Sequence, residues 1–370
     1  MRRTQDFLLA ALAAGSVCLA GPAARAASFT VTNLVTDDQM ANPAQTTDGD
    51  LQNPWGVSYG PTSPFWVSDN GTGVSTIYSV DPTTNATTKL GLTVTIPGDG
   101  TATGQAFNGD SSQFHGDLFL FGSEDGTVSG WRGALGTTAE ILQSPSDNSY
   151  KGTAIGTIGS DSYLYAANFA TGNIDVLKGT PGAPNLAGNF TDPNLPSGFA
   201  PFNVQNLGGT LYVTYAVRGS NGDDVAGAGN GVVDAYDLQG NFLSRIASHG
   251  ALDSPWGLAI APSSFGTLAG DLLVGNFGDG KINAFDLTTN MPAGTLMGPG
   301  NTPISIDGLW ALIPGNGGMA GSIDSIYFSA GPDEESHGPF GVIAAVPEPG
   351  TLLLLGFGLA GLARWGRRTA

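Results

Sequence analysis

An internal repeat of about 50 residues is the feature that most limits how this chain can fold. Six segments have similar sequences, and they follow one another at spacings of 48, 48, 50, 55 and 51 residues. They lie around Gly56, Gly104, Gly152, Phe202, Gly257 and Gly308. The copies NPWG and SPWG, at Gly56 and Gly257, are the clearest. A period of this length is typical of one four-stranded propeller blade.

Each repeat presents strand signals in the same order. A β-branched and aromatic run that ends in Gly, Asn or Asp, the signature of a hairpin, occurs at 65–70, 117–126, 163–172, 211–215, 271–280 and 325–331. A third apolar run follows each of these, and fourth strands are expected at 93–96, 139–142, 242–246 and 294–297. Because no long segment has a 3.6-residue period, helices should be nearly absent. The sequence therefore predicts an all-β, six-bladed propeller with four-stranded blades.

The sixth repeat is one strand short, because it runs out at Val346. The segment FTVTNLV at 29–35 precedes the first repeat and has the alternation of a strand. As the outer strand of the last blade it would close the ring and remove open sheet edges. A β-sandwich is the alternative, but it does not explain six copies of one unit.

The first 26 residues have the pattern of a secretory signal peptide. Arg2 and Arg3 precede an apolar run at 7–20, and small residues stand before the expected cleavage between Ala26 and Ala27. This cleavage leaves a propeller domain over 27–345.

Cys18 lies inside this signal and is the single cysteine of the chain. A lipoprotein anchored through it is the alternative, but Val17 stands where that signal requires Gly or Ala. Removal of the signal leaves no cysteine, which excludes disulfides, thiol nucleophiles and cysteine metal sites.

Residues 27–346 carry 7 basic and 29 acidic residues, a net charge of −22. Nucleic acid and anionic membrane surfaces are therefore excluded as partners, because both would be repelled. The plainer interpretation is that these charges keep a secreted surface solvated. We expect a monomer.

The last segment, 346–370, has three parts. The motif Pro347-Glu348-Pro349 is followed by an apolar run at 351–363 and then by a basic cluster of Arg364, Arg367 and Arg368. Thirteen apolar residues are short for a membrane span, and the basic end would stay on the cytoplasmic side. This pattern resembles the PEP-CTERM signal that exosortases read and cleave. An ordinary C-terminal anchor is the alternative.

The body also resembles a family. The stretches NPWGVSYGPTSPFWVSDNGTGVSTIY, YAANFATGNIDV and LLVGNFGDGKINAFD look like an uncharacterised family of exported bacterial proteins that often carry a PEP-CTERM tail. The resemblance spans roughly 29–345 and implies location and fold, with no activity attached. The blades are more distantly similar to NHL-type and lactonase-type propellers, in architecture only.

Oxygen-bearing side chains recur where the second strands end and in the loops that lead into the first strands. These loops share one face of a propeller, around the mouth of its channel. The candidates for a ligand or metal site are Asp69, Glu124, Asn168, Asn276 and Asp307. Such a ring suits calcium, which prefers oxygen ligands. The alternative is turn chemistry, because Asp and Asn favour β-turns for backbone reasons alone.

No catalytic machinery is evident in the sequence. His115, His249 and His337 fall at different points of their repeats, and no serine elbow or phosphate loop is present. The catalytic residues stay unknown, and a protein without catalysis is favoured.

Two functions follow as hypotheses. The first is a non-catalytic module, sorted to the cell surface or beyond, that binds a glycan, polymer or protein. The second is a calcium-assisted hydrolase or lactonase at the channel mouth. Signal peptidase and exosortase are the partners expected during export.

Overall fold

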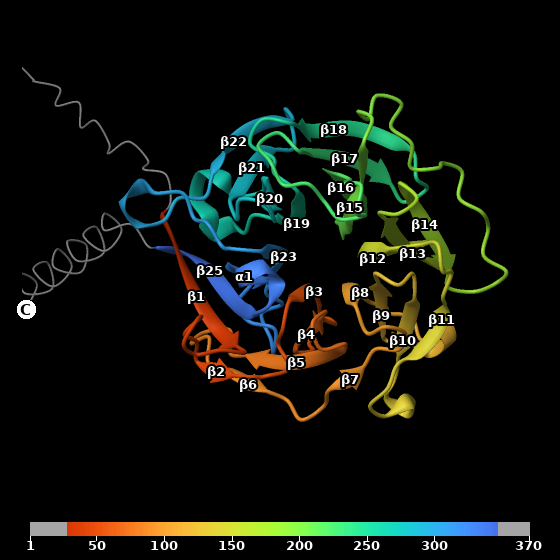
Figure 1. Cartoon of the computed structure of the whole chain (residues 1–370), viewed down its shortest axis with the longest axis horizontal. Coiled ribbons are helices and arrows are strands. Elements are labelled where there is room, and N and C mark those ends of the chain that lie inside the picture. The colour runs from red at the N-terminus through yellow and green to blue at the C-terminus, as the bar shows by residue number, and fades with distance from the viewer. Residues whose placement is uncertain (1–27, 347–370) are drawn as a thin grey trace, which may run out of the picture.

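The computed structural model describes residues 28–346 as six β-sheets around a central axis (Figure 1). Each sheet is one blade, which runs from an innermost strand beside the axis to the outer rim. The predicted all-β, six-bladed propeller is confirmed. Among the described residues, helices are limited to short turns such as α1 (Pro332–Glu335), as expected from the missing 3.6-residue period.

The first three blades follow one another along the chain. Blade 1 contains β3 (Pro54–Ser58), β4 (Phe65–Asp69), β5 (Val74–Val80), β6 (Thr87–Lys89) and β7 (Val94–Thr95). Blade 2 contains β8 (Ala102–Phe107), β9 (Phe119–Ser123), β10 (Val128–Trp131) and β11 (Glu140–Gln143). Blade 3 contains β12 (Tyr150–Ile158), β13 (Asp161–Asn168) and β14 (Asn173–Lys178).

The other three blades complete the ring. Blade 4 contains β15 (Phe199–Leu207), β16 (Thr210–Val217), β17 (Gly231–Asp237) and β18 (Phe242–Ser248). Blade 5 contains β19 (Pro255–Ile260), β20 (Leu272–Asn276), β21 (Ile282–Asp286) and β22 (Met291–Thr295). Blade 6 contains β23 (Leu309–Pro314), β24 (Ser325–Ala330), β25 (Pro339–Val346), β1 (Ser28–Thr36) and β2 (Thr46–Thr47).

Three blades depart from the predicted four-strand pattern; in blade 6, β2 is a fifth strand that pairs parallel with β1. In blade 1 both β6 and β7 pair with β5, although only the segment 93–96 was expected there. Blade 3 has three strands in the described chain. After the third strand the chain crosses to blade 4, and there the backbone nitrogen of Phe190 donates a hydrogen bond to Gly240 O at 2.9 Å. The buried Phe190 ring lies 5.6 Å from Tyr165 and 5.5 Å from Tyr236. The segment in which a four-stranded blade 3 would have its fourth strand thus packs an aromatic side chain between blades 3 and 4 instead.

The first described strand completes the last blade. β1 pairs antiparallel with β25, from Ser28 opposite Val346 to Thr36 opposite Pro339. The prediction that residues 29–35 close the ring is confirmed. Blade 6 thus runs outward from β23 through β24 and β25 to β1, which takes the place of the missing fourth strand, and β2 pairs with the outer edge of β1.

Apolar burial fixes the register of β1. Phe29, Leu34 and Val35 are almost completely buried, and the Phe29 ring lies 4.7 Å from Phe265, which belongs to blade 5. A shift of one residue would turn the Phe29 side chain out of the core. β1 therefore joins blade 6 to its neighbour as well as to β25.

The repeated glycine allows the innermost strands of successive blades to approach closely. A methyl group on Gly104 would collide with the backbone nitrogen of Thr153 in blade 3. On Gly257 it would lie 2.6 Å from the carbonyl oxygen of Trp310 in blade 6. The glycine of the sequence repeat is thus the contact point between blades.

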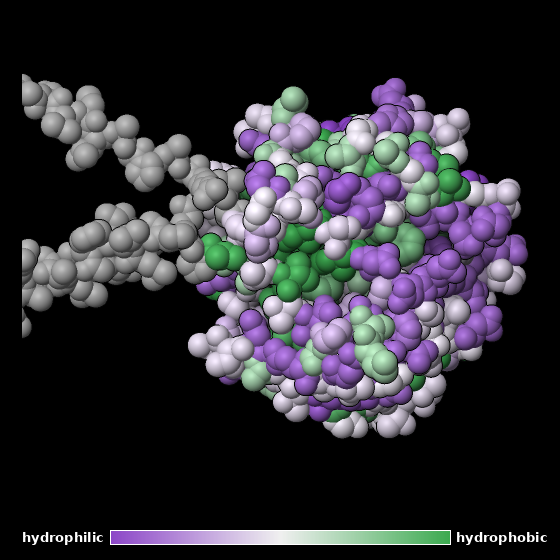
Figure 2. Space-filling view, turned by 60° about the vertical axis from the view of Figure 1, so that its left-hand side comes forward, coloured by the Kyte–Doolittle hydropathy of each residue, from purple (hydrophilic) through white to green (hydrophobic). Residues whose placement is uncertain are grey.

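Apolar side chains fill the spaces between the blades. Trp66 of blade 1 stacks on Phe119 of blade 2 with ring centroids 4.0 Å apart, and Trp131 lies 4.9 Å from Trp66. Hydrophilic side chains cover most of the side shown in Figure 2, where apolar ones gather in a hollow near the ends of the described chain. The core therefore forms layers between the blades, around the channel.

The closure can be tested by truncating Phe29. Phe29→Ala should lower the free energy of unfolding by about 3–5 kcal/mol, because it removes a buried ring. Val31→Ala is the matched control, since Val31 lies on the same strand and is 40% exposed; its effect should stay within about 0.5 kcal/mol. Urea denaturation measures both. Equal effects would contradict the assignment of β1 as a strand that the core depends on.

The closure should also depend on pH. His337 Nδ1 lies 2.8 Å from Asp37 Oδ2, just beyond the ends of β25 and β1, and this hydrogen bond raises the pKa of His337 above its ordinary value. The stabilisation is complete below the unfolded pKa of about 6.5 and is lost as the pH rises through the higher folded value. Stability curves of the protein and of His337→Gln should therefore converge on going from pH 6 to pH 9. Curves that stay parallel would show that His337 does not contribute in this way.

Candidate functional site

The loop face of the channel carries a polar cluster, which we call the mouth cluster: Asn53, Asn70, Glu124, Lys151 and Glu335. Asn53 Nδ2 donates to Glu335 Oε2 at 2.6 Å and to Asn70 Oδ1 at 3.3 Å. Asn70 Nδ2 donates to Glu124 Oε2 at 3.0 Å, and Lys151 forms an ion pair with Glu124. Three blades and the α1 turn therefore contribute to one continuous network.

Glu335 reaches this network through an unusual turn. Asp333, Glu334 and Glu335 have φ values of 54°, 55° and 65°, the left-handed region that non-glycine residues rarely occupy. α1 lies beside the innermost strands β3 and β23 (Figure 1). Burial raises the pKa of the Glu335 carboxyl, and the nearby carboxylate of Glu124 adds to the rise. The strained turn thus holds a partly desolvated acid over the channel.

Beneath the mouth cluster, aromatic side chains close the channel. We call Trp55, Phe202, Trp256 and Trp310 the aromatic plug. Trp55 stacks on Trp310 with centroids 3.5 Å apart, and Trp256 meets both at about right angles. The ammonium group of Lys151, whose side chain is 5% exposed, lies 5.3 Å from the Trp55 ring. Lys151 is therefore enclosed between the plug and Glu124.

The plug arises from the repeat itself. Trp55, Lys151 and Trp256 each stand directly before the repeated glycine. Because neighbouring strands touch at that glycine in blades 1, 2, 3 and 5, the residue before it lies at the same level of the channel in those blades. The sequence signal for this position is the residue before the glycine in the two PWG copies and in YKG, and none of these three residues was among the predicted site residues.

The structure distributes the five predicted site residues between different environments. Asp69 is fully buried, and its Oδ2 accepts a hydrogen bond from Thr76 in the same blade at 2.7 Å. Burial raises the pKa of Asp69 well above its ordinary value. Glu124 is the one predicted residue in the mouth cluster.

The two predicted asparagines bond within their own blades. Asn168 Oδ1 accepts from Ser149 N and Thr171 N, both at 3.2 Å. Asn276 Nδ2 donates to Ala251 O at 2.8 Å and to Asp279 Oδ1 at 2.9 Å.

Asp307, the last of the five, lies on the loop face, where its Oδ2 accepts from Asp333 N at 3.2 Å. Among the described residues, no hydrogen bond joins any two of these five side chains. In the part of the chain that the structure describes, no group of three or more His, Cys, Asp or Glu side chains is placed to hold a metal ion. Calcium binding stays a prediction.

The opposite end of the channel is open and holds a cavity of about 310 Å³. All six innermost strands, or the residues that directly follow them, contribute to its lining: Gly56, Val57, Ser58, Tyr59, Gln105, Ala106, Phe107, Thr153, Ala154, Ile155, Asn203, Gln205, Asn206, Leu207, Trp256, Ala311, Leu312, Ile313 and Pro314. None of these residues is an acid, a lysine, an arginine or a histidine. Burial raises the pKa of Tyr59 to about 12, so the lining is uncharged at neutral pH.

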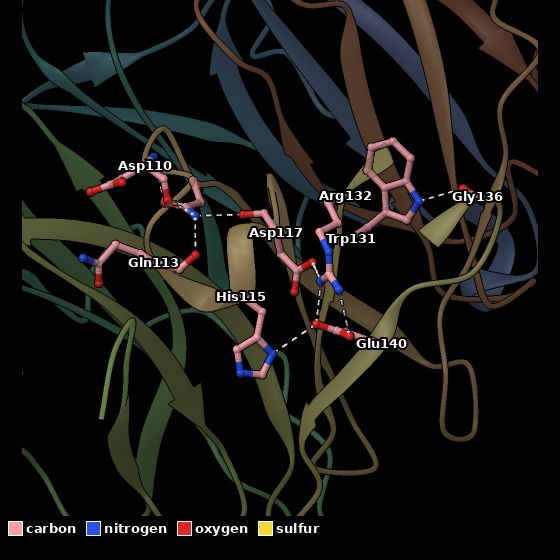
Figure 3. Close-up of polar contacts among 9 residues, drawn as sticks. Asp110, Gln113, His115, Asp117, Trp131, Arg132, Gly136 and Glu140 are labelled. Carbon is pink, nitrogen blue, oxygen red and sulfur yellow. Dashed lines mark hydrogen bonds and ion pairs between the residues drawn. The ribbon is translucent and has the colours of Figure 1, made fainter. Parts of the chain in front are cut away.

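A second polar network lies in blade 2, away from the channel (Figure 3). Arg132 bridges the buried carboxylate of Asp117 at 2.7 Å and Glu140 at 2.6 Å, and Glu140 lies 3.1 Å from His115 Nδ1. Arg132 lowers the pKa of Glu140, so this carboxylate stays ionised and paired. The network ties a loop to two strands, which is a structural role.

Comparison with known proteins indicates where this protein is sorted and which proteins are related to it. Residues 345–368 match the PEP-CTERM protein-sorting motif, which confirms the resemblance of the tail; the tail lies outside the described residues. The motif indicates export and cell-surface sorting, with processing by an exosortase. No helix among residues 28–346 is long and apolar enough to cross a membrane.

Solved structures show the fold alone. The PQQ-bound aldose sugar dehydrogenase of Streptomyces coelicolor is 16% identical, with a TM-score of 0.51 over 88% of this chain and all of that one. A streptogramin B lyase is 11% identical, with a TM-score of 0.45 over 86% of this chain and 97% of that one. The likeness to the dehydrogenase agrees with a propeller fold, and neither likeness carries an activity.

Two curated relatives come from Acanthamoeba polyphaga mimivirus. "Uncharacterized protein L690" is 29% identical over 87% of each chain. "Uncharacterized protein R648" is 30% identical over 87% of this chain and 82% of the relative. This chain belongs to the same protein family as that viral protein.

Proposed function

We propose that this exported propeller is a non-catalytic binding module, which takes its ligand at the open end of the channel. The single observation that carries the proposal is the cavity formed by all six innermost strands. Cavities of about 300 Å³ or more with aromatic walls and a few polar groups are typical of ligand sites. Rigid strands surround this one, so little order has to be gained on binding.

The loop face supports the same conclusion from the other side. Its carboxylates and its lysine are engaged with one another in the mouth cluster, and the aromatic plug separates them from the cavity. A nucleophile or general base must reach a reacting atom directly or through one water. Lys151, at 5% exposure, is enclosed instead.

The calcium-assisted hydrolase is the competing hypothesis. It requires Asp69, Asn168 and Asn276 to gather around one calcium ion, whereas each of them bonds separately in its own part of the ring. Binding in the cavity uses a space that already exists.

The positions of the first and last strands are compatible with removal of both terminal segments during export. β1 begins at Ser28 and β25 ends at Val346, and these two residues are paired. Removal of residues 1–26 and of the tail from Pro347 onward would therefore leave each strand whole. We propose that the tail anchors the protein during transit and that the processed monomer reaches the cell surface or the medium.

Mass spectrometry of the exported protein tests this processing. We expect a chain that starts at Ala27 and ends between Pro347 and Gly350. An exported chain that retains Arg368 would show that the tail serves only as an anchor.

A matched pair of tryptophan substitutions tests which end of the channel binds. Gln205→Trp fills the cavity, whereas Asp223→Trp adds the same bulk to an exposed loop on the other face. We expect Gln205→Trp to lower retention on the extracellular polymers of the exporting cells by about tenfold, a loss of about 1.4 kcal/mol. Asp223→Trp should leave it unchanged. Cosedimentation with those polymers measures both.

The reverse pattern would place the ligand on the loop face and contradict the proposal. Retention that requires calcium and is removed by a chelator would favour the competing hydrolase.

A further inference from the structure

We infer that the cavity at the open end of the channel binds the terminal unit of a neutral saccharide. This inference rests on the proposed function and adds the chemical class of the ligand. Three properties of the lining carry it: its charge, its aromatic walls and the state of its polar groups.

The charge of the lining excludes ionic ligands. The cavity is uncharged, whereas residues 27–346 carry a net charge of −22. An anionic ligand would be repelled by the surrounding field. A cationic ligand would have to leave water without a carboxylate to pair with, which is unfavourable. A neutral ligand meets neither penalty.

The aromatic walls suit a flat, partly apolar ligand. Tyr59, Phe107 and Trp256 line the cavity. Tyr59 is held in place because its hydroxyl donates to Pro314 O at 2.8 Å and its ring lies 5.6 Å from Phe65. A sugar ring has one face of C–H groups, which can pack on such a side chain while its hydroxyls remain free.

The polar groups of the lining are neutral and fixed. Gln105 Nε2 donates to Ser58 Oγ at 2.7 Å and to Trp66 O at 2.9 Å, while its Oε1 accepts from Ser68 and Ser75. Gln105 is therefore saturated and orients Ser58.

Ser58 accepts in that bond, so its own proton remains for a ligand. Gln205 adds an amide that can both donate and accept. Sugar hydroxyls also both donate and accept hydrogen bonds, so they are complementary to the polar side chains of the cavity.

The volume limits how much of a glycan can enter. A space of about 310 Å³ is comparable to that of about ten water molecules. One hexose ring with its hydroxyls fits this space, and a longer stretch of chain does not. The site therefore recognises a chain end.

Isothermal titration of the processed protein tests this class of ligand. The probes are the neutral tetrasaccharides maltotetraose and laminaritetraose, the acidic tetragalacturonate, and 1-octanol as an apolar control. We expect at least one neutral tetrasaccharide to bind with a Kd below about 1 mM, and tetragalacturonate and octanol not to bind at that level.

Gln205→Glu keeps the shape of the side chain and adds a charge; it should weaken neutral binding by about tenfold or more. Gln52→Glu makes the same change on the loop face and should leave the affinity unchanged.

The outcomes separate this inference from the proposed function. If Gln205→Trp abolishes retention on the polymers but neither neutral probe binds, or if tetragalacturonate or octanol binds instead, the ligand class is wrong and the binding module stands. Equal losses in Gln205→Glu and Gln52→Glu would overturn the site. If Gln205→Trp leaves retention intact, the proposed function itself fails.

Discussion

The contact between the innermost strands is the constraint on which the rest of the molecule depends. Gly104 and Gly257 each lie against the backbone of the innermost strand of the next blade. The distance is so short that a methyl group on either glycine would collide with that backbone. The backbone contact at these glycines determines how close the innermost strands lie to the central axis. It therefore fixes the width of the channel and the height at which each blade contributes a side chain to it. In blades 1, 2, 3 and 5 one repeated glycine thus sets how closely the innermost strands approach.

The two ends of the channel follow from this arrangement. Residues just before the contact include the four aromatic residues of the plug, with Thr103 in blade 2 and Lys151 in blade 3 at the equivalent positions. A buried lysine needs a partner, because a desolvated charge is otherwise costly, and Glu124 supplies it. Residues after the contact are small, apolar or amide-bearing and leave the cavity open. The closed end is held by charge pairing and the open end is free of charge.

The fold was largely predictable, because its signals are local: alternation, turn residues and a constant period. The candidate site was less so. Ser123 pairs with Ala102 as Asp69 pairs with Pro54, so Glu124 lies one residue beyond the position of Asp69. Successive side chains of a strand point to opposite faces, and this single step separates a buried side chain from one in the mouth cluster. Blade 3 lacked its fourth strand for a tertiary reason, the packing of Phe190 between two blades.

Ring closure also orders the events of export. Partners across the β1–β25 pair, such as Thr30 and Ala344, are separated by 314 residues, so the pair cannot form until nearly the whole body has been translocated. Such long-range pairing is slow and leaves strand edges open until it is complete. The sorting motif begins at Pro347, directly after the last residue of β25. The anchor that we propose for the tail would keep the last strand at one place while the first strand pairs with it. Ring closure and the sorting motif thus involve adjacent residues of the chain.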